Sequence, residues 1–301
     1  MIRIPRLPSF FIRYVLNPLE AVFVFGIYGF FRIMPVDAAS ALGGWLARMI
    51  GPLTPVSNRA LRNLSRAYPE KSAREIRTIV SGMWDNLGRV AAEYPHLGSF
   101  HLYDDKGRFE VVGAENVDLL REDERPGIFF SGHIANWEMV SMCATQRGVP
   151  LDRVYRVANN WIVEWLYRHG RAVVAGTLIP KGPQGVRALL RSFKGGRHVG
   201  LLVDQKMNDG IAVPFFGLDA MTAPALAELA LRFDCPVVPG RAIRLKGARF
   251  RVELFPPMRF ERTGDRHADV LAAMTQVNAL LENWVREYPE QWLWLHNRWP
   301  D

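Results

Sequence analysis

A histidine and a glutamate five residues apart, His133 and Glu138, are the side chains of this sequence best suited to acid–base chemistry. They lie in the stretch 127–138, GIFFSGHIANWE, where an apolar strand is expected to deliver the histidine into a turn and a helix to return the carboxylate. Histidine titrates near neutral pH, and a neighbouring carboxylate can fix the orientation of its ring and stabilise the imidazolium. The pair therefore predicts a general base that can deprotonate an alcohol.

The spacing by itself is weak evidence, because a chain with seven histidines and 30 acidic residues is expected to hold such a pair almost once by chance. A second pair with the same spacing, His296 and Asp301, does occur. Pro300 stands between its members and no strand-to-helix turn positions them, so we expect this second pair to have no role. The competing interpretation of His133 is a hydrogen-bonded histidine at the end of a strand.

Alternating helices and strands predict an α/β fold with a largely parallel or mixed sheet flanked by helices. The expected helices cover 37–50, 57–68, 72–94, 134–147, 159–169, 184–194 and 222–233, and the expected strands cover 109–113, 127–131, 153–157, 198–203, 236–245 and 250–255. Ser72 with Glu75 three residues later is typical of a capping box at a helix start. We expect residues 36–301 to form one catalytic domain, which a chain of this length can build around one large core.

Polar residues follow three of these strands at their carboxyl ends, where open α/β sheets bind ligands. His133 follows one strand, Arg156 ends the next, and Asp204 with Gln205 follows the strand 198–203. Taken singly, each is as easily a surface cation or a turn residue. Their convergence on one edge of the sheet favours a binding site.

The first 35 residues predict a membrane anchor or an interfacial helix. An unbroken apolar run, AVFVFGIYGFF at 21–31, follows three arginines and is closed by Arg32. About 20 apolar residues are needed to cross a bilayer, so this run could span only with snorkelling ends, and a buried helix is the alternative. The absence of a small-residue cleavage site after the run argues against a signal peptide that is removed.

Composition restricts the partners. The net charge is +8, with nine tryptophans and 17 phenylalanines, which favours an anionic partner such as a membrane surface or an acidic protein. Nucleic acid is disfavoured, because the basic residues are scattered and we find no zinc-finger, RNA-binding or basic-zipper pattern. The two cysteines, Cys143 and Cys235, lie in apolar surroundings and indicate reduced thiols rather than a disulfide framework.

Five ordered segments resemble the lipid A biosynthesis acyltransferases, within the glycerolipid and lysophospholipid acyltransferase group. They are SGHIANWE at 131–138, YRVANN at 155–160, VDQ at 203–205, VPFFG at 213–217 with Thr222, and PEQWLWLHNRW at 289–299. The resemblance covers nearly the whole chain. It implies a glycerol-3-phosphate acyltransferase-like α/β fold at the cytoplasmic face of the inner membrane.

The resemblance also implies the reaction. His133, paired with Glu138, would deprotonate a hydroxyl on a lipid A precursor, and the alkoxide would attack an acyl thioester carried by acyl carrier protein or by coenzyme A. It implies no metal and no cofactor beyond this co-substrate. Substrate-binding roles fall on residues of the matching segments and on one arginine after the next helix: Asn136, Arg156, Arg171, Asp204 and Gln205.

Two further surfaces follow from position alone. An acyl groove is expected near Asp204, lined by Met207, Phe215, Phe216, Met221 and Leu226, unless these side chains are core. A basic helix face with Arg187, Arg191 and Lys194 could bind the acidic carrier protein, unless it is only solvated.

Three other functions stay open. A lysophospholipid or another glycolipid could be the acceptor, and a thioesterase could use the same base to activate water. The chain lacks the Gly-x-Ser-x-Gly nucleophile elbow of many hydrolases. A membrane-associated binding protein without catalysis is the third alternative.

Overall fold

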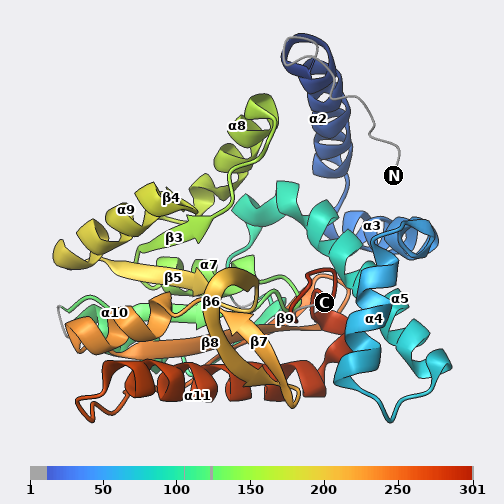
Figure 1. Ribbon diagram of the computed structural model, residues 1–301. Helices are drawn as coiled ribbons and strands as arrows, with labels where there is room; N and C mark the ends of the chain where they lie inside the picture. Colours follow the sequence, from blue (N-terminus) through green and yellow to red (C-terminus); the bar gives the residue numbers. More distant parts are fainter. Residues whose placement is uncertain (1–11, 105, 123–124, 300–301) are drawn as a thin grey trace.

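A computed structural model describes residues 12–104, 106–122 and 125–299, and it has the predicted α/β architecture (Figure 1). The main sheet has seven strands in the order β1-β9-β8-β2-β5-β3-β4. Its strands are β1 (Phe109–Val112), β2 (Ile128–Ser131), β3 (Leu151–Tyr155), β4 (Leu178–Pro180), β5 (His198–Leu202), β8 (Val237–Lys246) and β9 (Arg249–Leu254). Strands β8, β2, β5, β3 and β4 run parallel, whereas β9 is antiparallel to β8 and β1 pairs parallel with β9.

The central strand β2 fixes the position of the site. All four of its residues are buried, as expected for a parallel strand covered on both faces. It pairs with β5 on one side, in a register that places Ser131 opposite Leu202. The residues that follow β2 and β5 therefore leave the same edge of the sheet side by side.

The helices surround this sheet and mostly follow the expected ranges. They are α2 (Asn17–Ile33), α3 (Val36–Ile50), α4 (Ser57–Ala67), α5 (Ala73–Glu93), α6 (Glu115–Glu122), α7 (Glu138–Gln146), α8 (Trp161–Gly170), α9 (Pro183–Lys194), α10 (Ala225–Phe233) and α11 (Arg266–Glu287). The predicted capping box is confirmed, since the Ser72 side chain accepts from the Glu75 backbone N–H while the Glu75 carboxylate accepts from the Ser72 N–H. Helix α7 begins four residues later than expected, because the turn before it is not helical.

Several elements were not anticipated: α6, the short strand β4, the long helix α11, and a separate hairpin of β6 (Lys206–Phe215) and β7 (Leu218–Thr222). The hairpin turns at Phe216 and Gly217, which both have positive φ angles of 54° and 71°. Such a two-residue turn suits the twist of a hairpin, but phenylalanine is an unusual occupant. Its ring compensates by packing against Tyr68, Trp294 and Trp299.

The helix α2 projects from the rest of the molecule, with α8 rising beside it (Figure 1). Residues Ile12–Ile33 are long and apolar enough to cross a membrane, judged by length and composition. The predicted boundary between residues 35 and 36 falls in the connection between α2 and α3.

Candidate active site

The turn after β2 presents His133 at the edge of the sheet with 12% of its side chain exposed. Its backbone carbonyl accepts a hydrogen bond from the Leu293 N–H at 3.1 Å. The N–H of Ala135, which has a φ of 47°, donates to the Gln291 carbonyl at 2.9 Å. The segment after α11 thus pairs with the turn and holds its strained backbone.

Asp204, which follows β5, makes two contacts with His133. One carboxylate oxygen, Oδ2, accepts from the His133 backbone N–H at 2.6 Å, and the other, Oδ1, lies 2.7 Å from the ring Nδ1. The Trp292 indole also donates to Oδ2 at 2.7 Å. Burial would raise the pKa of Asp204, but the charge of the imidazolium and these hydrogen bonds outweigh it and hold the pKa well below the usual range.

An ionised carboxylate only accepts hydrogen bonds, so the His133 Nδ1 must carry a proton, and in the neutral ring the lone pair is then on Nε2. This is the tautomer that a general base needs. The expected partner was wrong in one respect, because the residue that orients the His133 ring is Asp204 and not Glu138.

Gln205 lies over the free ring nitrogen. Its side-chain nitrogen is 3.2 Å from the His133 Nε2 and 3.0 Å from the Nε2 of His296. An amide NH₂ has two donor hydrogens, so it can serve both rings at once. His296, dismissed from the sequence because of its poor spacing partner, therefore belongs to the site.

His296 stays neutral at physiological pH. Burial, assisted by the neighbouring His133, lowers the pKa of His296 from 6.5 to about 4. A neutral ring can accept the Gln205 amide hydrogen and adds no charge beside the base.

This pKa predicts a pH-dependent loss of stability. Below pH 6.5 the unfolded chain protonates His296 while the folded chain does not until pH about 4, so the free energy of unfolding falls across this window. The expected loss from this group is about 3 kcal/mol, at about 1.4 kcal/mol for each pKa unit. Urea unfolding in detergent at several pH values, with His296→Gln beside wild type, measures it. If the free energy of unfolding falls equally steeply with decreasing pH in wild type and in His296→Gln, the prediction is wrong.

Glu138, the first residue of α7, binds two arginines. Its Oε1 accepts from the Arg171 Nε at 2.9 Å and from Nη2 at 2.6 Å, and its Oε2 lies 3.8 Å from Arg153. Burial opposes the charge of Arg171, but the Glu138 carboxylate outweighs it and raises the pKa of Arg171 above its ordinary value. The three side chains form a largely buried charged cluster in which Arg171 is held in a fixed pose.

Of the two remaining predicted site residues, Arg156 is exposed and Asn136 is buried. Arg156 is exposed just after β3, and it makes no hydrogen bond or ion pair with any described residue. Asn136 is buried and its amide donates to the Glu93 carboxylate at 2.9 Å. Asn136 thus faces the protein beneath the turn rather than the edge where His133 is exposed.

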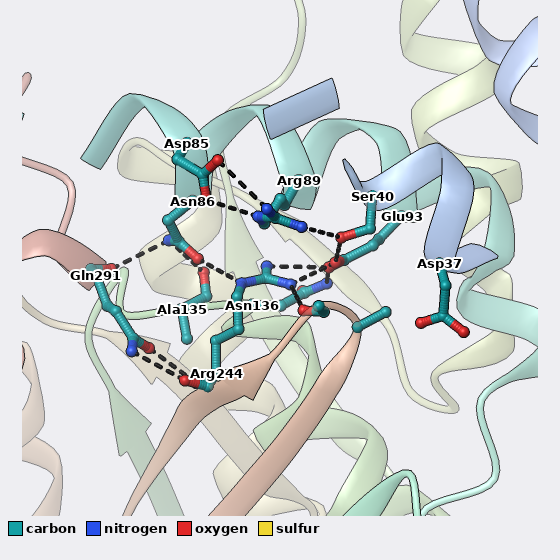
Figure 2. A network of polar contacts seen from close by, with 12 residues as sticks. Asp37, Ser40, Asp85, Asn86, Arg89, Glu93, Ala135, Asn136, Arg244 and Gln291 are labelled. Atoms are coloured by element: carbon teal, nitrogen blue, oxygen red, sulfur yellow. Dashed lines mark hydrogen bonds and ion pairs between the residues drawn. The ribbon is translucent and has the colours of Figure 1, made fainter. Parts of the chain in front are cut away.

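Glu93, at the end of α5, is the centre of a polar network under the turn that holds His133 (Figure 2). Its fully buried carboxylate pairs with both terminal nitrogens of Arg244 and accepts from the Ser40 hydroxyl at 2.7 Å as well as from Asn136. A buried carboxylate needs this many donors to offset its lost hydration. The network therefore links α3, α5 and β8 to the turn.

A second branch of the network reaches the same turn. Asn86 accepts from the Arg244 Nε at 2.9 Å and donates to the carbonyls of Ala135 and Gln291, each at 3.2 Å. Gln291 in turn exchanges hydrogen bonds with the Arg244 backbone. Figure 2 shows these side chains converging on Ala135 and Asn136 from separate elements.

Breaking this network should destabilise the protein strongly. Glu93→Ala leaves the Arg244 guanidinium buried without its partner, and the expected cost is about 3–5 kcal/mol in the free energy of unfolding. The matched control is Glu110→Ala, whose ion pair with Arg251 is largely solvated and should matter little. Urea unfolding in detergent compares them, and equal effects of the two changes would contradict the buried role.

The proposed groove residues divide between core and surface. Phe215, Phe216 and Leu226 are buried in the main core, whereas Met207 is exposed. Trp292 and Trp299 pack on Phe215, so the phenylalanines are part of the wall behind the site. Phe215, Phe216 and Leu226 are therefore core residues, as the alternative interpretation expected, and do not line an open groove.

Within residues 12–104, 106–122 and 125–299, no group of three or more His, Cys, Asp or Glu side chains is arranged to hold a metal ion.

Comparison with known proteins gives matches over most of the chain. A family model described as bacterial lipid A biosynthesis acyltransferase matches residues 11–301. The chain is 23% identical over 290 residues to the lipid A biosynthesis palmitoleoyltransferase of Escherichia coli (strain K12), covering 92% of this chain and 89% of that protein. It is 25% identical over 248 residues to the lauroyltransferase of the same organism, covering 79% and 76%, and 25% identical over 254 residues to the myristoyltransferase, covering 83% and 77%.

Proposed function

Because the chain belongs to the bacterial lipid A biosynthesis acyltransferases, and is thus a transferase, we propose that it moves a fatty acyl group to a hydroxyl of a lipid A precursor. We further propose that the donor is an acyl thioester on acyl carrier protein. The observation that carries the proposal is the His133–Asp204 pair, which leaves one ring nitrogen as a base at an accessible edge of the sheet.

In the proposed reaction the His133 Nε2 removes the proton of the acceptor hydroxyl as its oxygen bonds to the thioester carbonyl carbon. Asp204 stabilises the imidazolium that results. The tetrahedral intermediate collapses with cleavage of the carbon–sulfur bond, and the imidazolium returns its proton to the departing thiolate. The acceptor hydroxyl would take the place of the Gln205 amide at Nε2.

Two arginines suit the anionic head of such an acceptor. Arg171 is pre-positioned by Glu138, and Arg156 is an exposed cation without a partner among the described residues. A guanidinium binds phosphate with charge-assisted, paired hydrogen bonds. In this proposal Glu138 acts through Arg171 as a positioning residue, and Asn136 acts through the turn.

The donor is proposed to dock on α9. Arg187, Arg191 and Lys194 are all exposed and make no ion pair with any described residue, so their charge is available to an acidic carrier protein. The helix begins just after β4, at the end of the sheet where Arg156 lies, and its last turn, with Arg191 and Lys194, leads back to the start of β5.

Reversing this charge tests the docking surface. The double change Arg187→Glu and Arg191→Glu should raise the KM for the carrier-bound donor about tenfold or more and leave kcat nearly unchanged, because it weakens encounter without touching the base. Steady-state kinetics at low ionic strength measure both constants. The control is an acyl coenzyme A donor, whose KM should change less. An unchanged KM for the carrier-bound donor would remove α9 from the proposal.

The whole proposal is tested by acyl transfer in detergent micelles with a tetra-acylated lipid A precursor and a panel of acyl thioesters. The expected product is the precursor with one added acyl chain, detected by mass spectrometry. Free fatty acid released at the same rate without acceptor would favour the thioesterase alternative. Transfer only to a lysophospholipid would redirect the acceptor assignment.

We also propose that the enzyme works at the cytoplasmic face of the inner membrane, where a cytosolic carrier protein can reach it. The apolar helix α2 supports a location at the membrane.

A further inference from the structure

The apolar helix α2 is bound along its outer half by α8. The Asn160 side chain, which caps α8, donates to the Asn17 carbonyl at 2.7 Å and to the Glu20 carboxylate at 3.0 Å. One turn further, the ring of Trp165 stacks on Phe25 with centroids 6.0 Å apart. The tip of α8 therefore lies level with the outer end of α2.

The inner end of α2 is fixed to the catalytic domain. The His96 ring lies 2.8 Å from the Phe31 carbonyl, which caps the last turn of the helix. The Tyr94 hydroxyl donates at 2.7 Å to the Tyr167 carbonyl near the base of α8. Helices α2 and α8 thus form one unit that stands on the domain (Figure 1).

This unit presents apolar side chains to solvent. On α8, Trp161 is 63% exposed and Trp165 is 52% exposed. Only 11% of the most apolar stretch of α2 is buried, and large side chains of that helix are exposed beside α8, among them Leu19, Val22, Phe23 and Ile27. Arg168, a cation in the last turn of α8, is exposed at its base. The apolar tip of α8 suits the acyl chains of a membrane, and its cationic base suits the headgroups at the surface.

The coupling of the two helices restricts how they meet a bilayer. Helix α8 has ten residues and is about 15 Å long, roughly half the thickness of the hydrocarbon layer. Residues 156–160, which lead to its tip, are not helical and are largely exposed. If α2 crossed the membrane, this loop would lie in hydrocarbon, where exposed non-helical backbone is not tolerated.

We infer that α2 and α8 lie together in the boundary between headgroups and acyl chains of one leaflet, so that the protein is monotopic and α2 does not cross the bilayer. The outer end of α2 and the catalytic domain are then on the same side of the bilayer. The occupant of the apolar surface is lipid, and α8 is a second membrane-binding element beside α2.

Side-specific labelling tests the topology. Single cysteines replace Ser9 ahead of α2 and Gln276 on α11, at the opposite end of the molecule, and the full-length protein is reconstituted into sealed phosphatidylethanolamine and phosphatidylglycerol vesicles. The native thiols are buried, so wild type gives the background. An impermeant maleimide should label both positions to the same extent before lysis and gain the same fraction after lysis. Opposite protection of the two positions would show that α2 spans and would overturn the inference.

Depth measurements test α8 separately. A fluorophore on Trp161→Cys should be quenched at least twofold by lipids with a nitroxide on the acyl chain, as should one on Val22→Cys in α2. The same fluorophore on Gln276→Cys is the control and should be unaffected. Quenching at Val22 but not at Trp161 would leave α8 in water and overturn the inference, and so would the absence of quenching at both positions. None of the four labelling positions is a site residue, so acyl transfer in micelles checks the proposed function independently.

Discussion

Replacing His133 with alanine should lower the rate of acyl transfer by about 100- to 10,000-fold, while the protein stays folded. The change removes the only nitrogen that Asp204 prepares as a base, and the Asp204 carboxylate remains bound by Trp292. The measurement is product formation with the lipid A precursor and acyl carrier protein thioesters in detergent. Near-ultraviolet circular dichroism confirms that the tryptophan-rich core is intact.

The matched control for this prediction is His101→Ala, since His101 is exposed and belongs to none of the contacts of the site. Its transfer rate should equal that of wild type. If His133→Ala keeps more than about a tenth of the wild-type rate, general-base catalysis by this residue is wrong. The family assignment would survive, and the base would have to be sought among other residues.

The second large effect is expected for Asp204→Asn, which keeps the shape of the side chain but removes its charge. An asparagine can also donate, so it no longer forces the proton onto the His133 Nδ1, and it cannot stabilise the imidazolium. The rate of transfer should fall by about 100- to 10,000-fold. Steady-state kinetics measure the fall, which should appear in kcat rather than in the KM for either substrate.

A structural role of Asp204 would give a different result, so the test needs a direct readout. Nitrogen-15 NMR of the His133 ring should show protonated Nδ1 in wild type and a shifted tautomer balance in Asp204→Asn. The control is Asp209→Asn, an exposed aspartate on the neighbouring β6, which should change neither the spectrum nor kcat. An unchanged tautomer with full activity would show that Asp204 does not have the orienting role.

Much of the fold could be predicted because its signals are local. The buried run of β2, the capping box of Ser72 and Glu75, and the alternation of strands and helices are all written in neighbouring residues. The long helix α11 was missed although its buried residues Val270, Ala273, Val277 and Leu281 recur at helical spacing, so its pattern was present. The hairpin β6–β7 was harder, because its turn uses phenylalanine where glycine or asparagine is usual.

The sequence predicted which residues lie near His133 better than it predicted which of them form hydrogen bonds with each other. The sequence predicts that His133, and Asp204 with Gln205, follow two strands at the same edge of the sheet, and the structure pairs these strands and brings the three side chains together. It does not reveal that α7 starts at Glu138 itself, which aims that carboxylate at Arg171. Glu93 also escaped notice, since its only signal is burial, a property of the folded chain.

The closing segment 289–299 has a consequence for the order in which the enzyme is made. It supplies the Trp292 indole to Asp204, the Leu293 N–H to the His133 carbonyl and the ring of His296 to Gln205. A ribosome synthesises this segment after every other element that the structure describes, whereas α2 emerges near the beginning. The growing chain can therefore reach the membrane before the contacts of His133 are assembled, and under the proposed mechanism it is inactive until segment 289–299 folds against the turn.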